Sequence, residues 1–204
     1  MVLQKYDIGL MLLHVITACI RPGNLPLLHD SFLQAAENKT VDLRWHISME
    51  SRGNREPKHP DVSYSKFPTT TYLGDLDNSP INRPLQSITD GWICWVDDDN
   101  LMHPEFISGI LEHCDEPQIL VYHQQLTKRP ALFNPLIRYV DNGSCRPGRI
   151  DTGQFCIHSR LLEGIRWNGS HPQPDGLFVQ AVHNRYPTKV KTVNQVLAYY
   201  NQLA

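Results

Sequence analysis

The strongest constraint on this chain is an unbroken apolar segment that ends in three consecutive carboxylates. Residues 92–96 are Trp-Ile-Cys-Trp-Val, and residues 97–99 are Asp-Asp-Asp. A run this short cannot make a helix of its own, and apolar side chains at every position are typical of a strand covered on both faces. Pro104 then favours a helix over residues 104–114. The acids are therefore expected at the C-terminal end of a central strand.

The position of these acids predicts a binding site. Open α/β sheets bind ligands beyond the C-terminal ends of their strands. Adjacent carboxylates repel one another, so they need a cation, solvent or hydrogen-bond donors beside them. Because Mg²⁺ and Mn²⁺ prefer oxygen ligands and also bind phosphate oxygens, we predict a Mn²⁺ or Mg²⁺ site here. For the short motif alone, a solvated acidic loop is the alternative.

Size and charge limit the function classes. The chain has 204 residues, which suits one α/β domain, with a nucleotide-binding part over about residues 8–125 and an acceptor-side part over about 126–204. Its formal net charge is −2 and no basic patch is evident, which argues against a nucleic-acid partner.

Cysteine spacing and hydropathy bear on location. The five cysteines include no C-x-x-C pair, so neither a disulfide framework nor a zinc ribbon is indicated, and a reducing, cytoplasmic location fits best. A chain trimmed at its N-terminus would look the same, which leaves a lumenal location open. The apolar run 8–20 is shorter than the ~20 residues of a membrane span, so we predict a buried strand there.

Strands and helices alternate through the first 125 residues, which predicts an α/β fold with a mostly parallel, Rossmann-like central sheet flanked by helices. Predicted strands cover residues 10–20, 41–49, 69–73, 92–96 and 118–124, and predicted helices cover 25–38, 84–89 and 104–114. Residues 50–66 are expected to form a loop and 75–79 a turn.

The second half is more irregular, because prolines and glycines interrupt it. Predicted elements are a strand at 150–158, helices at 159–165 and 177–184, and a closing strand at 190–200.

Thr17 and Arg21 lie at the C-terminal end of the first predicted strand, where a hydroxyl and a guanidinium could contact a nucleotide. Arg83 precedes a helix N-terminus that could receive a diphosphate. Each also has a plain structural interpretation, as a β-former or a surface charge.

These motifs resemble those of a known family, the GT-A nucleotide-sugar glycosyltransferases. The stretches that carry the resemblance are Thr17-Ala-Cys-Ile-Arg21-Pro22, Asn82-Arg83, Val96-Asp-Asp-Asp-Asn100 and Ile150-Asp-Thr-Gly-Gln-Phe155. Within the fold they are similar to the inverting β-1,3-glucuronyltransferases, and the family 2 glycosyltransferases are the other near pattern. Tyr199-Tyr200 stand where the glucuronyltransferases have a histidine.

The resemblance implies a role for each matched residue. Asp99 would coordinate the divalent metal, and Asp97 and Asp98 would hold the ribose or assist the metal. Thr17 and Arg21 would lie by the nucleotide of a nucleoside-diphosphate sugar, and Arg83 by its phosphates. Asp175 takes the position of the general base, and Asp151 that of a contact to the acceptor, a glycan or another hydroxyl compound. Asp175 could equally be a helix N-cap.

This chemistry is consistent with the residues. Sugar transfer builds negative charge on the leaving phosphate, which a metal at Asp99 and the Arg83 guanidinium would stabilise. Asp175 would take the acceptor's proton. Three alternatives stay open at this point, namely a sugar-1-phosphate nucleotidyltransferase, a metal-dependent phosphohydrolase with water as acceptor, and a catalytically silent sugar-nucleotide-binding domain.

Overall fold

The apolar segment before the acids forms an interior strand. The computed structural model describes residues 10–49, 71–73, 81–126, 136–168 and 170–203, so the predicted loop at 50–66 and turn at 75–79 lie outside the described residues. In chain order its strands and helices are β1 Met11–Cys19, α1 Leu25–Ala36, β2 Val41–Met49, β3 Thr71–Leu73, α2 Asn82–Ser87, β4 Trp92–Trp95, β5 Leu101–Met102, α3 Phe106–Leu111, β6 Ile119–Gln125, β7 Ile137–Arg138, β8 Phe155–His158, α4 Pro174–Arg185 and β9 Val190–Tyr199.

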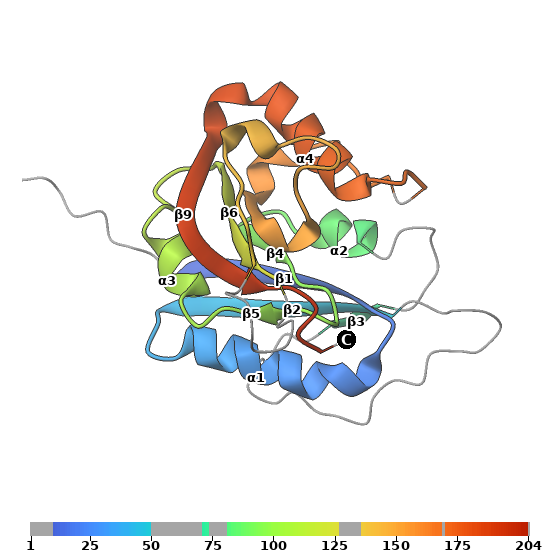
Figure 1. Cartoon of the computed structure of the whole chain (residues 1–204), viewed down its shortest axis with the longest axis vertical. Coiled ribbons are helices and arrows are strands. Elements are labelled where there is room, and N and C mark those ends of the chain that lie inside the picture. The colour runs from blue at the N-terminus through green and yellow to red at the C-terminus, as the bar shows by residue number, and fades with distance from the viewer. Residues whose placement is uncertain (1–9, 50–70, 74–80, 127–135, 169, 204) are drawn as a thin grey trace, which may run out of the picture.

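All described strands join one mixed sheet, in the order β3-β2-β1-β4-β8-β6-β9-β5, with β7 paired to β6 (Figure 1). The neighbours β3, β2, β1 and β4 run parallel, which confirms the predicted α/β fold with a parallel core. The second half departs from simple alternation, because β8 lies antiparallel between β4 and β6. Strands from both predicted parts of the chain therefore share one sheet.

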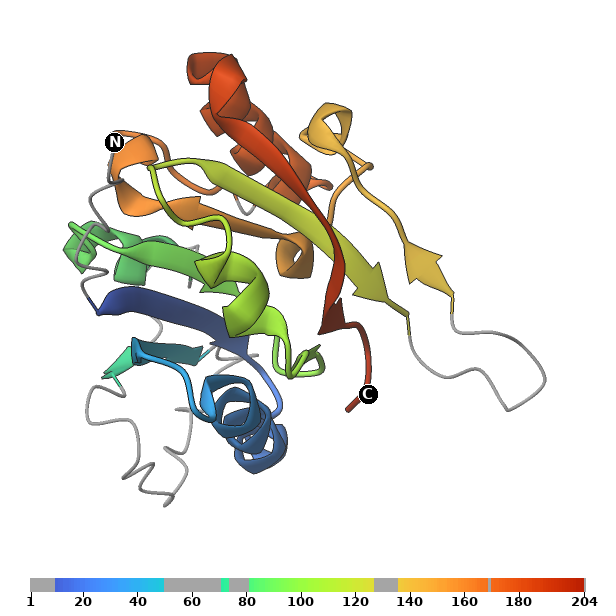
Figure 2. The ribbon, with the colours of Figure 1, turned by 90° about the vertical axis from the view of Figure 1, so that its left-hand side faces the viewer.

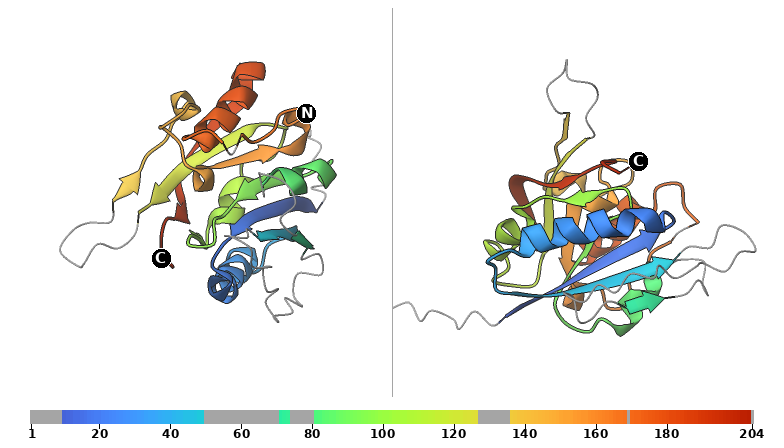
Figure 3. Two further views of the ribbon diagram at one scale, coloured as in Figure 1. Left: turned by 90° about the vertical axis from the view of Figure 1, so that its right-hand side faces the viewer. Right: turned by 90° about the horizontal axis from the view of Figure 1, so that it is seen from below.

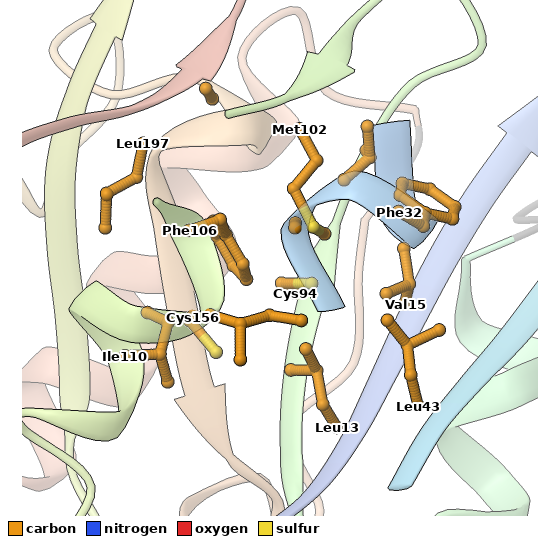
Figure 4. Packing of buried hydrophobic residues seen from close by; sticks show 14 of the residues in the cluster. Leu13, Val15, Phe32, Leu43, Cys94, Met102, Phe106, Ile110, Cys156 and Leu197 are labelled. Atoms are coloured by element: carbon orange, nitrogen blue, oxygen red, sulfur yellow. The ribbon is translucent and has the colours of Figure 1, made fainter. Parts of the chain in front are cut away.

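Helices cover both faces of the sheet (Figures 1 and 2). On one face, α1 and α3 enclose a core in which Phe32 and Phe106 meet strand residues such as Val15 and Cys94 (Figure 4). On the other, Phe178 and Val182 of α4 pack on Trp95 and other strand residues. Apolar side chains on both faces of β4 are what a strand between two helical layers requires.

Several predicted boundaries are wrong by a few residues. The helix predicted at 104–114 is α3, Phe106–Leu111, and the one at 177–184 begins earlier, at Pro174, because proline suits the first helical turn. The strand predicted at 150–158 begins only at Phe155, since the backbone over Thr152–Gln154 forms a 3-10 turn. The helix predicted at 159–165 is a 3-10 turn, Ser159–Leu161.

The β6–β7 hairpin extends beyond the rest of the sheet, whereas the chain end after β9 turns back beside β5 (Figures 2 and 3). The predicted buried strand in the apolar N-terminal run is confirmed as β1, whose residues are buried or half-buried. Within the described ranges, no helix is long and apolar enough to span a membrane.

Candidate active site

The three acids follow β4 as a tight turn at the C-terminal edge of the parallel strands. The Val96 N–H donates to Ile16 O at 3.0 Å, which extends the β1–β4 pairing up to the acids. The Asn100 N–H donates to Asp97 O at 3.0 Å and closes the turn. The carboxylates therefore project from the end of a fully buried strand, as the sequence predicts.

Asp98 points into the protein. Its Oδ2 accepts from the Ile20 N–H at 2.6 Å and from the Arg21 N–H, and its Oδ1 is 2.6 Å from Arg21 Nη1. The side chain is only 2% exposed. Both oxygens are thus used to hold the β1–α1 turn, and Asn24 Nδ2 donates to Asp98 O at 2.9 Å from the same turn. This geometry assigns Asp98 a structural role in the β1–α1 turn rather than the predicted contact with the donor.

Thr17 is likewise turned inward. Its side chain is fully buried, and Oγ1 accepts from Trp45 Nε1 at 3.0 Å on the face that α1 covers. A nucleotide contact from this hydroxyl has no support in the structure. Arg83 lies inside the first turn of α2 rather than before it, and its side chain lies outside what the structure describes.

Asp99 is partly exposed and pairs with Arg21. Arg21 Nη1 is 3.1 Å from Asp99 Oδ2, and the two side chains are 43% and 16% exposed. Burial raises the pKa of the Asp99 carboxyl, while the Arg21 guanidinium opposes that shift. The structure therefore brings Arg21 against the loop of Asp97, Asp98 and Asp99, the acid loop, and the contact of Arg21 with a nucleotide stays a prediction.

Asp175 lies in the first turn of α4, where the sequence places it, but it is no N-cap. The cap residue is Gln173, which makes no side-chain capping bond. Burial raises the pKa of the Asp175 carboxyl, and hydrogen bonds with Thr152 partly offset the shift. A carboxyl with a raised pKa is a stronger proton acceptor when ionised.

The helix that carries Asp175 is held very close to the preceding loop. A Cβ on Gly176 would lie 2.4 Å from Pro147 Cα and 2.6 Å from Arg146 O. Glycine at this position therefore permits an approach that any side chain would block. Asn82 adds a second constraint, since its amide exchanges hydrogen bonds with the Trp167 backbone at 2.7 and 2.8 Å.

Asp151 begins the 3-10 turn before β8. Its Oδ1 accepts from the Gly153 N–H at 3.3 Å, and its Oδ2 is 2.9 Å from Arg138 Nη1. The Gln154 side chain closes the turn, because Oε1 accepts from the Asp151 N–H at 3.1 Å and Nε2 donates to Arg138 O at 3.1 Å. Asp151 thus precedes β8, the neighbour of β4 on the side away from β1.

The carboxylates converge electrostatically on Asp97. The pKa of Asp97 is well above its usual value, first because of burial and then because of repulsion by the neighbouring carboxylates of Asp151, Asp175, Asp99 and Asp98. Acids from the loop after β4, from the turn before β8 and from the first turn of α4 are thus close enough to raise the pKa of Asp97. Such a cluster is a candidate active site, since perturbed carboxyls gather where charge is to be handled.

Sequence reasoning missed Arg138 at this cluster and gave no role to Tyr200. The Arg138 guanidinium carbon lies 5.3 Å from the centroid of the Tyr200 ring. Burial raises the pKa of Tyr200, and repulsion by Asp151 and Asp99 adds to the shift. Arg138 stands in an irregular stretch without a motif, so only its tertiary position shows its relation to Asp151.

The chain end also reaches the acid loop. The Leu203 N–H donates to Asp99 O at 3.0 Å, and the Asn201 N–H donates to Asn100 Oδ1 at 2.8 Å. Asn24 Nδ2 contacts Leu203 O at 3.2 Å. These bonds connect the β1–α1 turn, the acid loop and the segment after β9. Among the described residues, no three His, Cys, Asp or Glu side chains are grouped as a ready-made metal site.

Comparison with known proteins identifies the fold. No family model and no curated protein matches the sequence. Solved structures do match. S. aureus TarS in complex with UDP-GlcNAc is 11% identical with a TM-score of 0.63, over 93% of this chain and 58% of that one. The mannosyltransferase PcManGT from Pyrobaculum calidifontis, solved with GDP-Man and Mn²⁺, is 12% identical with a TM-score of 0.60, over 93% and 56%.

The chain has the GT-A glycosyltransferase fold. A third match, glucosyl-3-phosphoglycerate synthase from Mycobacterium tuberculosis with Mn²⁺ and UDP, is 11% identical with a TM-score of 0.54, over 94% of this chain and 72% of that one. The chain spans about 60% of the length of the first TarS structure it matches. The predicted GT-A fold is confirmed, while the finer resemblance to β-1,3-glucuronyltransferases stays a prediction from sequence motifs.

Proposed function

We propose that the chain is a metal-dependent glycosyltransferase domain. It would move a sugar from a nucleoside-diphosphate sugar, with UDP-sugars favoured, to a hydroxyl of a glycan or other acceptor, with inversion at the anomeric carbon. The observation that carries the proposal is the place of Asp97 and Asp99 after an interior strand of a GT-A fold, next to β8, whose preceding turn carries Asp151 and, at Thr152, a hydrogen bond with Asp175. Nucleotide sugars and Mn²⁺ in the similar structures support it.

The acid loop fits a divalent cation at Asp99 and Asp97. In the free protein both Asp98 oxygens are bonded to the β1–α1 turn, whereas Asp97 is half-buried and neighbouring carboxylates raise its pKa by a repulsion that a cation would relieve. Mg²⁺ and Mn²⁺ need few protein ligands when substrate phosphates and water complete the shell. When bound, the ion would stabilise the charge on the leaving diphosphate. Arg21 and Arg83 would bind the same phosphates.

On the acceptor side, Asp175 would take the proton of the attacking hydroxyl. Its raised pKa suits this role, because a base whose pKa is nearer to neutrality accepts a proton more readily. Asp151 would accept a hydrogen bond from the acceptor, and Arg138, which orients Asp151, would donate one. A single displacement with inversion requires a base for the attacking hydroxyl, the proposed role of Asp175, and stabilisation of the leaving diphosphate, the proposed role of the metal at Asp99.

A thermal-shift panel tests the proposal. UDP-, GDP-, dTDP- and CMP-sugars are each added with and without Mn²⁺, to the wild type and to Asp99→Ala. We expect one nucleotide class to raise the melting temperature only with Mn²⁺, and Asp99→Ala to lose that shift, because a ligand stabilises the state it binds. Loss in Asp98→Asn with retention in Asp99→Ala would overturn the metal assignment.

Product analysis separates the alternatives. For the donor that binds, we expect a free nucleoside diphosphate and a glycosylated acceptor. Phosphate release in water without any acceptor would identify a phosphohydrolase, and transfer of the nucleoside monophosphate would identify a nucleotidyltransferase. Binding without turnover over a wide acceptor panel would indicate a silent domain.

A further inference from the structure

The structure places a guanidinium on the candidate metal ligand. Arg21 Nη1 is 2.6 Å from Asp98 Oδ1 and 3.1 Å from Asp99 Oδ2. Asp98 is a buried structural acid, whereas the Asp99 side chain is partly exposed. One oxygen of the proposed metal site is therefore already bonded to a positive charge in the free protein.

The two halves of Arg21 are held very differently. Its backbone N–H donates to Asp98 Oδ2, next to the Ile20 N–H that donates to the same oxygen at 2.6 Å. Its side chain, by contrast, is 43% exposed. The guanidinium can therefore change partners while the turn stays in place, and Asp98 keeps two backbone donors when it does.

A guanidinium on Asp99 has a defined electrostatic effect on cation binding. Like charges at this range repel, so the affinity of Asp99 for a divalent ion is reduced as long as Arg21 stays bonded to it. A diphosphate offers the guanidinium a better partner, because Arg binds phosphate oxygens through parallel N–H bonds.

We propose that Arg21 exchanges partners when the donor binds, from Asp99 in the free protein to the diphosphate in the complex, and thereby couples cation binding to nucleotide binding. This inference rests on the proposed function, since it requires a cation at Asp99 and a diphosphate donor. Coupling is reciprocal, so cation and nucleotide must each tighten the other by the same factor.

Binding of Mn²⁺ alone, UDP alone and UDP at saturating Mn²⁺ tests the exchange, with GDP in parallel. Free Mn²⁺ is followed by its electron paramagnetic resonance signal, and nucleotide by calorimetry. In Arg21→Gln we expect Mn²⁺ alone to bind about tenfold more tightly, because a unit charge some 5 Å from a divalent ion is removed. The factor by which Mn²⁺ tightens UDP should shrink by a similar amount.

Arg44→Gln is the matched control. Arg44 is 39% exposed and bonded to Asp42 at 2.9 Å, so it is comparable in exposure and pairing. In the sheet Arg44 lies opposite His14, which is seven residues before Arg21. Seven residues of strand span about 23 Å. Arg44 is therefore farther from the proposed metal site than the ~8 Å over which charges interact in physiological salt. We expect unchanged Mn²⁺ affinity. Arg21→Lys keeps the charge and should bind Mn²⁺ alone as the wild type does.

The outcomes distinguish the two proposals. Wild-type protein that binds no nucleotide with Mn²⁺ overturns the proposed function. Mn²⁺-dependent nucleotide binding, with equal Mn²⁺ affinity in wild type and Arg21→Gln, overturns the exchange alone. If Arg21→Gln fails to fold, the wild type can still overturn the exchange, because independent binding of Mn²⁺ and UDP is incompatible with it, and tighter binding of Mn²⁺ alone by Arg21→Lys than by the wild type would also overturn it.

Discussion

The Phe178 ring packs edge-on against Trp95, with ring centroids 5.5 Å apart and an interplanar angle of 74°. Trp95 lies two residues before Asp97, and Phe178 lies three residues after Asp175. Trp167 joins both rings, at 5.9 Å from Trp95 and 4.7 Å from Phe178. A buried aromatic cluster therefore holds the end of β4 and the start of α4, and with them the two acids, in a fixed relation.

The first prediction concerns Gly176. We expect Gly176→Ala to destabilise the protein by about 1–3 kcal/mol, because its Cβ would overlap the Pro147 backbone and α4 would have to shift. Urea unfolding measures the stability. Turnover should fall more than donor binding, since the shift moves Asp175. Gly23→Ala is the control, as a Cβ there meets nothing within 4 Å, and equal losses in both variants would contradict the prediction.

The second prediction concerns Asp98. Asp98→Asn should cost about 3 kcal/mol, because a buried charge-assisted network to two backbone N–H groups and the Arg21 guanidinium is broken. Denaturant unfolding provides the measurement. Asp30→Asn, at a carboxylate that is 74% exposed, should change stability by less than about 0.5 kcal/mol. A wild-type midpoint for Asp98→Asn would show that the turn is held by other contacts.

The third prediction concerns Asp175. Asp175→Asn should retain metal-dependent donor binding and lose about 10²–10⁴-fold in turnover, because an amide cannot accept the acceptor's proton. Calorimetry measures donor binding, and nucleoside-diphosphate release in the presence of acceptor measures turnover. Turnover within a few-fold of the wild type would exclude Asp175 as the general base.

The fourth prediction concerns a buried histidine pair away from the acids. His14 Nδ1 and His46 Nε2 are 2.8 Å apart, and both rings are buried. Burial, followed by repulsion from His14 and Arg44, lowers the pKa of His46 to about 4, and burial also lowers the pKa of His14. The unfolded chain therefore takes up a proton near pH 6.5, where the folded chain does not.

Stability should consequently fall as the pH drops from about 6.5 towards 4. For His46 the expected loss is about 2 kcal/mol between pH 7.5 and pH 5. The raised pKa values of Asp97, Asp99 and Asp175 act in the opposite direction, so the informative quantity is the difference from His46→Gln. Urea unfolding of both proteins at the two pH values measures it, and parallel pH profiles would refute the assignment.

Local signals made much of the fold predictable. An apolar run between Gly91 and three acids is compatible with little besides a buried strand, and β4 is one. The order and direction of the later strands were not predictable, because β8 is an apolar segment that would suit either direction. Its antiparallel place between β4 and β6 depends on which neighbours it can pair with and cover.

The candidate site also combines features that the local sequence predicts with features that depend on the tertiary fold. Where carboxylates follow a strand or begin a helix was predictable from the sequence, because local chain geometry places Asp97, Asp99 and Asp175. The direction of each side chain depends on the tertiary fold. It turned Thr17 and Asp98 inward because buried Trp45 and the β1–α1 turn needed polar partners, and it brought Arg138 to Asp151. Side-chain direction depends on partners distant in the chain, which a local pattern does not contain.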